Sequence, residues 1–195
     1  MARAQTRERV LQAAVRTLAS QGYARTTARA IARTGGFAPG VIYYHFTDLE
    51  DLFLATARFT SRARLERYQA EINGLTSAVD LVRRLRRLYA EDGAEGHIAA
   101  VQELIAAATS STRLAEQLRA ETGIWRDFAE TVLRGLLANT PLASVVPTRE
   151  LATAAVAGYL GIEMLSHLEA DRTAPDALFD AAERAAALAD SLHPQ

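Results

Sequence analysis

The stretch from Thr26 to Phe46 reads TTARAIARTGGFAPGVIYYHF and decides how this chain folds. It has the pattern of a short helix, a turn at Gly35-Gly36, and a second short helix that ends in aromatic residues. Two short helices joined at a steep angle by a glycine-containing turn form a helix-turn-helix, whose second helix fits the major groove of DNA. The stretch therefore predicts a helix-turn-helix over residues 27–46.

Local signals support both helices. A threonine hydroxyl at Thr26 or Thr27 suits the N-cap of a helix over 28–34. Pro39 suits the first turn of the following helix, where its missing N–H costs nothing. Ile42 and Phe46 are four residues apart and share the inward face, so Tyr43, Tyr44 and His45 are directed elsewhere.

The rest of the chain has helical character throughout, which predicts an all-α fold. A helix over residues 5–20 has an apolar stripe at helical spacing. Asp48 is a predicted N-cap for a long helix over 49–73. Further helices are expected at 77–91, ending at Asp92-Gly93, and at 97–109, 111–138, 147–168 and 174–191. Four arginines within 83–87 are interpreted as a solvated helix face.

Charge is distributed unevenly along the chain. Residues 1–46 contain seven arginines and one acidic residue, Glu8, whereas the chain as a whole has a net charge of −1. A basic head on an acidic body is expected when one end of a protein meets phosphate groups.

Several function classes find no support in the sequence. There is no cysteine, the four histidines have no metal-ligand spacing, and no glycine-rich phosphate loop or nucleophile elbow occurs, so we expect no metal, no cofactor and no enzyme activity. No apolar run approaches the roughly 18 residues that cross a bilayer, and the start lacks the apolar core of a signal peptide. A cytoplasmic protein without a membrane partner is expected.

The region from Gly22 to Leu52 resembles the TetR family of bacterial transcriptional regulators. The shared pattern consists of Gly22-Tyr23, Thr26-Thr27, Ile31-Ala32, Gly36, the run from Gly40 to Phe46, and Glu50-Asp51-Leu52. Two positions depart from it. Phe37-Ala38 stands where the family usually has Val-Ser, which removes an N-cap worth about 1 kcal/mol, and Leu49 replaces a frequent lysine that contacts phosphate.

This resemblance implies two domains. Residues 1–48 form a three-helix DNA-binding domain, and residues 49–195 form a helical domain that binds a ligand and dimerises. By the same resemblance, residues 38–44 form the recognition helix, the second helix of the helix-turn-helix. The DNA contacts come from this motif, with Thr27, Tyr43 and His45 on phosphates and Arg29 on a base edge or a phosphate. The expected DNA-binding residues are Thr27, Arg29, Ala38, Pro39, Val41, Tyr43, Tyr44 and His45.

The resemblance also implies a pocket for a small-molecule effector among the middle helices. Aromatic walls with a few polar groups suit a moderately apolar ligand. The candidates are Phe59, Tyr68, Tyr89, His97, Gln102, Glu103, Trp125, Phe128, Tyr159 and Met164. The last two helices, with Gly158 and Gly161 allowing close approach, are expected to pair with those of a second subunit, and the homodimer would bind a palindromic operator.

The sequence thus predicts a ligand-responsive transcriptional regulator, with repression implied by the family alone. Two alternatives remain open, a helical protein-interaction module and an all-helical enzyme without DNA affinity. Tyr43 packed on the first helix, or His45 serving only to hold the junction to the long helix, are alternatives for single residues. The effector, the operator and the regulated genes are not encoded in any motif.

Overall fold

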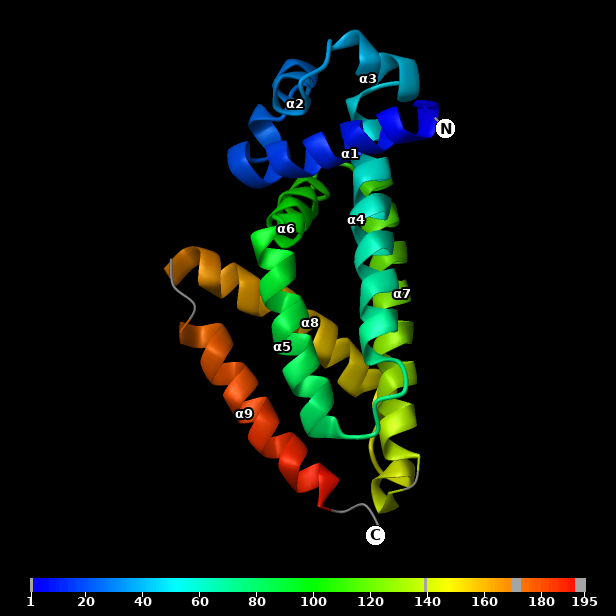
Figure 1. Cartoon of the computed structure of the whole chain (residues 1–195), viewed down its shortest axis with the longest axis vertical. Helices are drawn as coiled ribbons and strands as arrows, with labels where there is room; N and C mark the ends of the chain where they lie inside the picture. The colour runs from blue at the N-terminus through cyan, green and yellow to red at the C-terminus, as the bar shows by residue number, and fades with distance from the viewer. Residues whose placement is uncertain (1, 139, 170–172, 192–195) are drawn as a thin grey trace. The chain divides into compact units, whose positions relative to one another are not determined.

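The computed structural model describes residues 2–138, 140–169 and 173–191, and every regular element in these ranges is a helix, which confirms the all-α class (Figure 1). None of the helices described there is long and apolar enough to cross a bilayer. In chain order the elements are α1 (Ala2–Gln21), the 3-10 turn η1 (Tyr23–Arg25), α2 (Ala28–Gly35), α3 (Gly40–His45), α4 (Leu49–Ile72), α5 (Ala78–Ala94), α6 (His97–Ala107), α7 (Thr112–Leu137), the 3-10 turn η2 (Pro141–Ser144), α8 (Thr148–Glu169) and α9 (Thr173–Asp190).

Contacts within the chain divide it into two compact units. Unit 1 comprises the residues up to Arg64 together with Asp92–Glu121, and unit 2 comprises Leu65–Glu91 and the described residues from Thr122 onward. Unit 1 therefore holds α1, α2, α3 and α6 complete, and unit 2 holds α8 and α9. The functional division between residues 48 and 49 stays a prediction.

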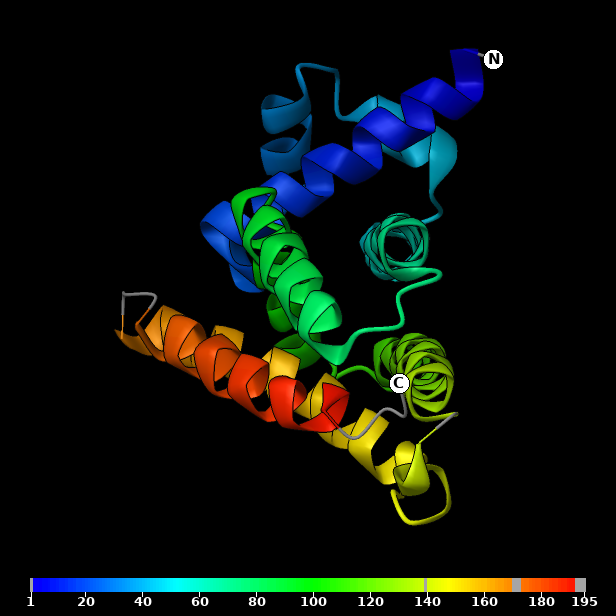
Figure 2. The ribbon, with the colours of Figure 1, turned by 60° about the horizontal axis from the view of Figure 1, so that its bottom comes forward.

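The core of unit 1 forms around the apolar stripe of α1, which packs against both α2 and α6 (Figure 2). Full burial of one valine, leucine or isoleucine side chain stabilises a fold by about 1.5–3 kcal/mol. The apolar residues that are buried here include Val10, Leu11, Ala14, Val15, Leu18, Ile31, Ile42, Phe46, Leu52 and Leu104.

Capping groups set both ends of α2. The Thr27 hydroxyl accepts a hydrogen bond from the backbone N–H of Ala30 at 3.2 Å, as predicted for this N-cap. At the other end Gly36 adopts φ +66°, a left-handed conformation that glycine reaches without steric cost, and its N–H caps the carbonyls of Ala32 and Arg33. These local signals fix α2 within one residue of its expected bounds.

The helix expected over 38–44 is shifted, because α3 begins at Gly40 and ends at His45. Ala38 and Pro39 form a tighter entry instead, in which the Val41 and Ile42 N–H groups bond to carbonyls three residues earlier. Neither residue offers a capping side chain, and Pro39 serves as the N-cap with αR dihedrals. The absent capping serine thus coincides with a shorter helix.

The start of α4 carries a reciprocal cap that the sequence predicted only in part. The Asp48 carboxylate accepts from the Asp51 N–H at 2.7 Å, and the Asp51 carboxylate accepts from the Thr47 N–H at 3.1 Å. Two backbone donors are thereby satisfied, and α4 is oriented directly after α3.

The expected helix end at Asp92-Gly93 is wrong, because α5 continues to Ala94. Asp92 is buried and accepts a hydrogen bond from Arg64 Nε at 2.7 Å, so its side chain is used in an ion pair of unit 1 instead of a turn. The turn between α5 and α6 instead contains Gly96, which has φ +75°.

The arginine-rich face of α5 is also more than a solvated surface. Arg86 donates to Asp176 and Asp180 of α9, both at 2.7 Å, and Arg83 donates to Glu183 at 2.7 Å. On the other side, Arg84 and Arg87 pair with Glu71 of α4. The four arginines therefore link α5 to two neighbouring helices within unit 2.

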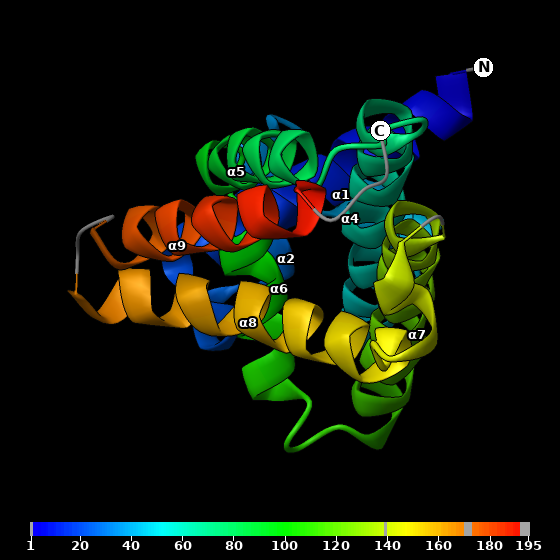
Figure 3. The same ribbon diagram turned by 90° about the horizontal axis from the view of Figure 1, so that it is seen from below.

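The last two described helices lie side by side in unit 2 (Figure 3). Asp190 near the end of α9 accepts from the N–H groups of Ala78 and Val79 at 2.7 and 3.1 Å and so caps the start of α5. Many of the described alanine, leucine and glycine residues of α8 and α9 are exposed to solvent in the single chain.

Candidate DNA-binding surface

The short helix α3 has one buried and one exposed face. Ile42 is fully buried and Phe46, directly after the helix, is nearly so, and these two residues anchor α3 to the core. Tyr43 is 57% exposed and Tyr44 is 66% exposed, although tyrosine is a large and partly apolar side chain. Tyr43 thus faces solvent and is not packed on the first helix, so both rings are available to a ligand.

The predicted residues of α2 and of the turn also lie at the surface. Thr27, Arg29, Ala38 and Pro39 are exposed. The Thr27 hydroxyl uses its oxygen as the acceptor in the N-cap, and its own O–H therefore remains able to donate to a phosphate oxygen. This double use is compatible with the contact predicted for Thr27.

His45 is half-buried between aromatic rings. Its ring meets that of Tyr44 edge to face at a centroid distance of 5.0 Å and lies 6.4 Å from that of Phe46. This position is compatible both with a structural role at the α3–α4 junction and with an imidazole N–H that reaches a phosphate.

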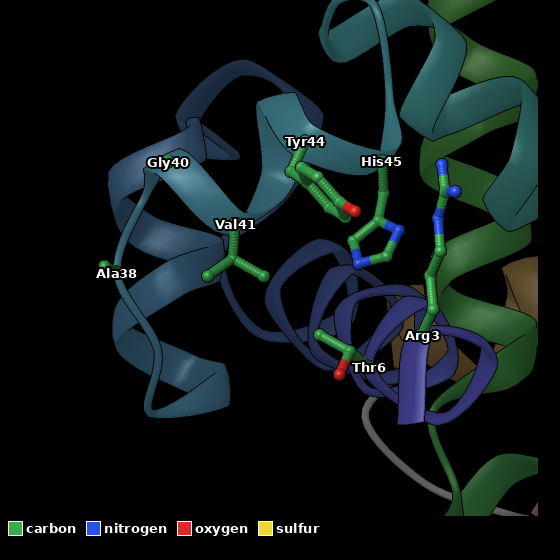
Figure 4. Close-up of a pocket in the computed structure, with 7 residues that line it drawn as sticks. All are labelled: Arg3, Thr6, Ala38, Gly40, Val41, Tyr44 and His45. Atoms are coloured by element: carbon green, nitrogen blue, oxygen red, sulfur yellow. The ribbon is translucent and has the colours of Figure 1, made fainter. Parts of the chain in front are cut away.

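Four of the eight predicted DNA-binding residues line one surface depression of about 610 Å³, namely Ala38, Val41, Tyr44 and His45. Gly40 completes the α3 side, and Arg3 and Thr6 form the α1 side (Figure 4). Thr27, Arg29, Pro39 and Tyr43 are exposed outside the residues that line it.

Sequence reasoning gave Arg3 only a diffuse electrostatic role and did not single out Thr6. The available signal was the spacing of Arg3, Thr6 and Arg7, which places them on one face of α1. In the structure the Arg3 guanidinium lies 5.2 Å from the centre of the Tyr44 ring, and that of Arg7 lies 5.0 Å from the centre of the Phe46 ring. The first turns of α1 therefore belong to this surface.

The ten predicted effector residues are divided between the two units. Phe59, His97, Gln102 and Glu103 belong to unit 1, and Tyr68, Tyr89, Trp125, Phe128, Tyr159 and Met164 belong to unit 2. None of them lines the depression beside α3 or a second depression on α9. Their role in binding an effector stays a prediction.

Within unit 2 most of the predicted residues pack on one another. The Tyr68 and Trp125 rings meet edge to face with their centroids 5.1 Å apart, and the Tyr89 and Tyr159 rings do so at 5.4 Å. The Tyr68 hydroxyl also forms a hydrogen bond to the Tyr159 hydroxyl, with 3.4 Å between the oxygens. Met164 differs, because its side chain is 57% exposed and so does not line the interior of a single subunit.

Within unit 1 the polar candidates have different environments. Glu103 accepts a hydrogen bond from the Tyr23 N–H at 2.6 Å and thereby holds η1, a structural contact that the sequence did not reveal. The Nε2 atom of His97 lies 3.3 Å from Oε2 of Glu95. The Gln102 amide nitrogen is buried and has no hydrogen-bond partner among the described residues, so it is a donor available to a bound molecule.

Comparison with known proteins agrees with this geometry. Residues 10–56 match the family model for bacterial regulatory proteins of the tetR family. The chain is 41% identical over 73 residues to the HTH-type transcriptional repressor AcnR of Corynebacterium diphtheriae, an alignment that spans 37% of each protein. The match therefore extends over well under two thirds of that relative's length.

Solved structures match over nearly the whole chain. A TetR-family member from Streptomyces coelicolor superimposes with a TM-score of 0.68 at 25% identity, covering 97% of this chain and 99% of the other. The regulator FadR from Bacillus subtilis, in complex with stearoyl-CoA, gives a TM-score of 0.77 at 16% identity, covering 92% and 96%. Residues 10–56 thus match the tetR-family model, and the fold of the whole chain is similar to those of TetR-family regulators.

Proposed function

We propose that this protein is a DNA-binding transcriptional regulator, a repressor that binds a palindromic operator as a homodimer and responds to a small molecule. The observation that carries the proposal is α3, a short helix in a TetR-type domain whose Ile42 is buried while Tyr43 and Tyr44 face solvent. Exposed phenol rings beside arginines suit a phosphate-lined groove. Such a protein acts on the chromosome, in the bacterial cytoplasm.

Base readout by α3 is limited by its side chains. Ala38, Pro39 and Val41 offer apolar contacts to a thymine methyl but no bidentate hydrogen bonds to a base. Arg29, Tyr43 and Tyr44 therefore supply most of the polar readout, together with the sequence-dependent shape of the operator.

A homodimer is supported by the exposed faces of α8 and α9. Each helix has an apolar stripe at helical spacing, with leucine side chains near its ends and alanine or glycine residues in the middle. A Cβ atom added to Gly158 or Gly161 would meet nothing within 4 Å, so a helix of a second subunit has room to approach closely. The exposed residues of the two stripes are Leu151, Ala154, Ala155, Gly158 and Leu165 on α8, and Leu178, Ala181, Ala182, Ala185 and Leu188 on α9.

A two-fold dimer places two copies of α3 about 34 Å apart, one turn of DNA, which matches a palindrome. An effector that favours a different dimer geometry would release the operator. The aromatic side chains of unit 2, with the Tyr68 and Tyr159 hydroxyls among them, support an effector with apolar and hydrogen-bonding parts. FadR, whose fold is similar, is in complex with stearoyl-CoA, a ligand of this mixed kind.

The proposal is tested by selecting bound fragments from random duplexes with the purified protein and measuring affinity by fluorescence anisotropy. We expect a palindromic consensus and an affinity that falls steeply with salt. Tyr43→Ala and Arg29→Ala should each weaken binding at least tenfold without changing the oligomeric state. Arg119→Ala, which removes an exposed arginine of α7, is the charge-matched control and should bind normally. No enrichment of any duplex would contradict the proposal.

A further inference from the structure

We infer that the depression between α1 and α3 binds one sugar-phosphate of the operator backbone, with Arg3 as a specific phosphate ligand that the Tyr44 ring holds in position. The inference rests on the proposed function and adds a second helix, α1, to the DNA-binding surface. It replaces the diffuse attraction expected of Arg3 with a defined contact.

The geometry of Arg3 is the first argument. Its guanidinium carbon lies 5.2 Å from the centre of the Tyr44 ring, within the range of a cation–π contact. Such a contact uses the face of the guanidinium and consumes none of its five N–H donors, so the fork stays free for two oxygens of a phosphate. Both side chains are exposed, so this donor fork is accessible to DNA.

The second argument is the composition of the depression. Its α3 wall is apolar where Ala38, Gly40 and Val41 contribute, whereas Arg3 and His45 bring hydrogen-bond donors (Figure 4). A deoxyribose with its phosphate has the complementary arrangement, an apolar ring beside an anion. The surrounding charge is also suitable, because Glu8 is the one acidic residue among the first 46 and its carboxylate accepts from Gln12.

The third argument is that α1 is fixed against α3 at this point. Arg7 lies one turn after Arg3, and its guanidinium covers the ring of Phe46, which is buried and follows α3 directly. Two arginine–aromatic contacts in succession give the first turns of α1 a defined place beside the recognition helix. An ordered arginine loses less conformational entropy on binding than a freely rotating one.

The experiment measures operator affinity at several salt concentrations for Arg3→Ala, Arg3→Lys and the control Arg16→Ala, an exposed arginine of the same helix. Because the homodimer carries two copies of Arg3, we expect Arg3→Ala to weaken operator binding about a hundredfold, tenfold for each lost charge-assisted contact. The slope of log K against log [salt] should fall by about 1.8, twice the value for one phosphate. Arg3→Lys should keep the slope and lose part of the affinity, because a lysine has no planar fork. Arg16→Ala should resemble the wild type.

Two further measurements locate the contact. The effect of Arg3→Ala should shrink in a Tyr44→Ala background, because the ring no longer holds the guanidinium. A scan of single methylphosphonate substitutions in the operator should find one position in each half-site where neutralising the phosphate weakens the wild type but not Arg3→Ala. Circular dichroism of each variant reports whether the helical fold is retained.

The inference is overturned if Arg3→Ala binds within twofold of the wild type with an unchanged salt slope while Tyr43→Ala loses binding. That result would leave the proposed function intact. Failure of the wild type to bind any duplex would instead overturn the proposed function itself, so the two failures are distinguishable.

Discussion

Glu103 provides the sharpest test of how α6 holds the N-terminal helices. Its carboxylate accepts the Tyr23 N–H at 2.6 Å, a short hydrogen bond between residues 80 positions apart. A hydrogen bond to a charged group contributes about 1.5–3 kcal/mol, and partial burial of this one favours the lower half of that range. We therefore expect Glu103→Ala to lower the free energy of unfolding by about 1.5–2 kcal/mol, which corresponds to roughly 3–8 °C in melting temperature for a chain of this size.

Gly22 offers a matched partner for a double-mutant cycle. It has φ +78° and ψ 166°, a conformation almost confined to glycine, and a Cβ atom there would lie 3.2 Å from Glu103 Oε2. Gly22→Ala thus costs backbone strain and crowding in the wild type, but strain alone when Glu103 is alanine. The double variant should therefore lose less free energy of unfolding than the sum of the losses of the two single variants.

The assay is urea unfolding followed by far-ultraviolet circular dichroism in the absence of any ligand, with Glu103→Gln as the control that keeps an acceptor oxygen. Glu103→Gln should lose less stability than Glu103→Ala. A residue reserved for an effector would leave the ligand-free protein as stable as before. Equal stability of Glu103→Ala and wild type would therefore refute the structural role and leave Glu103 as a predicted effector contact only.

Three other predictions follow from packing, charge and assembly. Ile42→Ala, at a fully buried position, should lower the free energy of unfolding by about 2–5 kcal/mol; calorimetry checks this, and a loss under 1 kcal/mol would contradict the packing. The hydrogen bond from Arg84, aided by Arg87, lowers the pKa of Glu71 in the folded protein. The ionised Glu71 carboxylate therefore stabilises the folded state fully above the pKa that Glu71 has in the unfolded chain, and this stabilisation is lost as pH falls through its pKa in the folded protein. Glu71→Gln should thus be less stable than wild type at pH 7 and equally stable in acid, and a difference that persists in acid would be the opposite result. Leu165→Glu and Leu188→Glu should give monomers in analytical ultracentrifugation, whereas Val145→Glu, an apolar position outside α8 and α9 that is at least as exposed, should leave the dimer unchanged.

Local features of the fold were predictable because their causes are close together in the sequence. The Thr27 and Gly36 caps of α2 bond to residues within four positions, and the inward face of α3 follows from the spacing of Ile42 and Phe46. The start of α3 was misplaced by two residues, because Ala38 and Pro39 make a tight turn of their own.

Contacts between distant residues were not predictable from local patterns. Asp92 was expected to end a helix, but Arg64, 28 residues earlier, holds it inside one. Arg83 and Arg86 of α5 are paired with acidic residues about 90 to 100 positions later, which no spacing rule within the helix indicates. The same limitation applies to the site, where Arg3 meets Tyr44 only after α1 and α3 have packed.

The central claim is that two copies of this chain hold two exposed α3 helices against one palindrome. Sedimentation of the purified protein with its selected duplex tests this most directly, because it reports stoichiometry and binding together. We predict an even number of subunits on the full palindrome, and a loss of affinity of several orders of magnitude when one half-site is scrambled. A single subunit bound with equal affinity to the half-site and the full site would contradict the account.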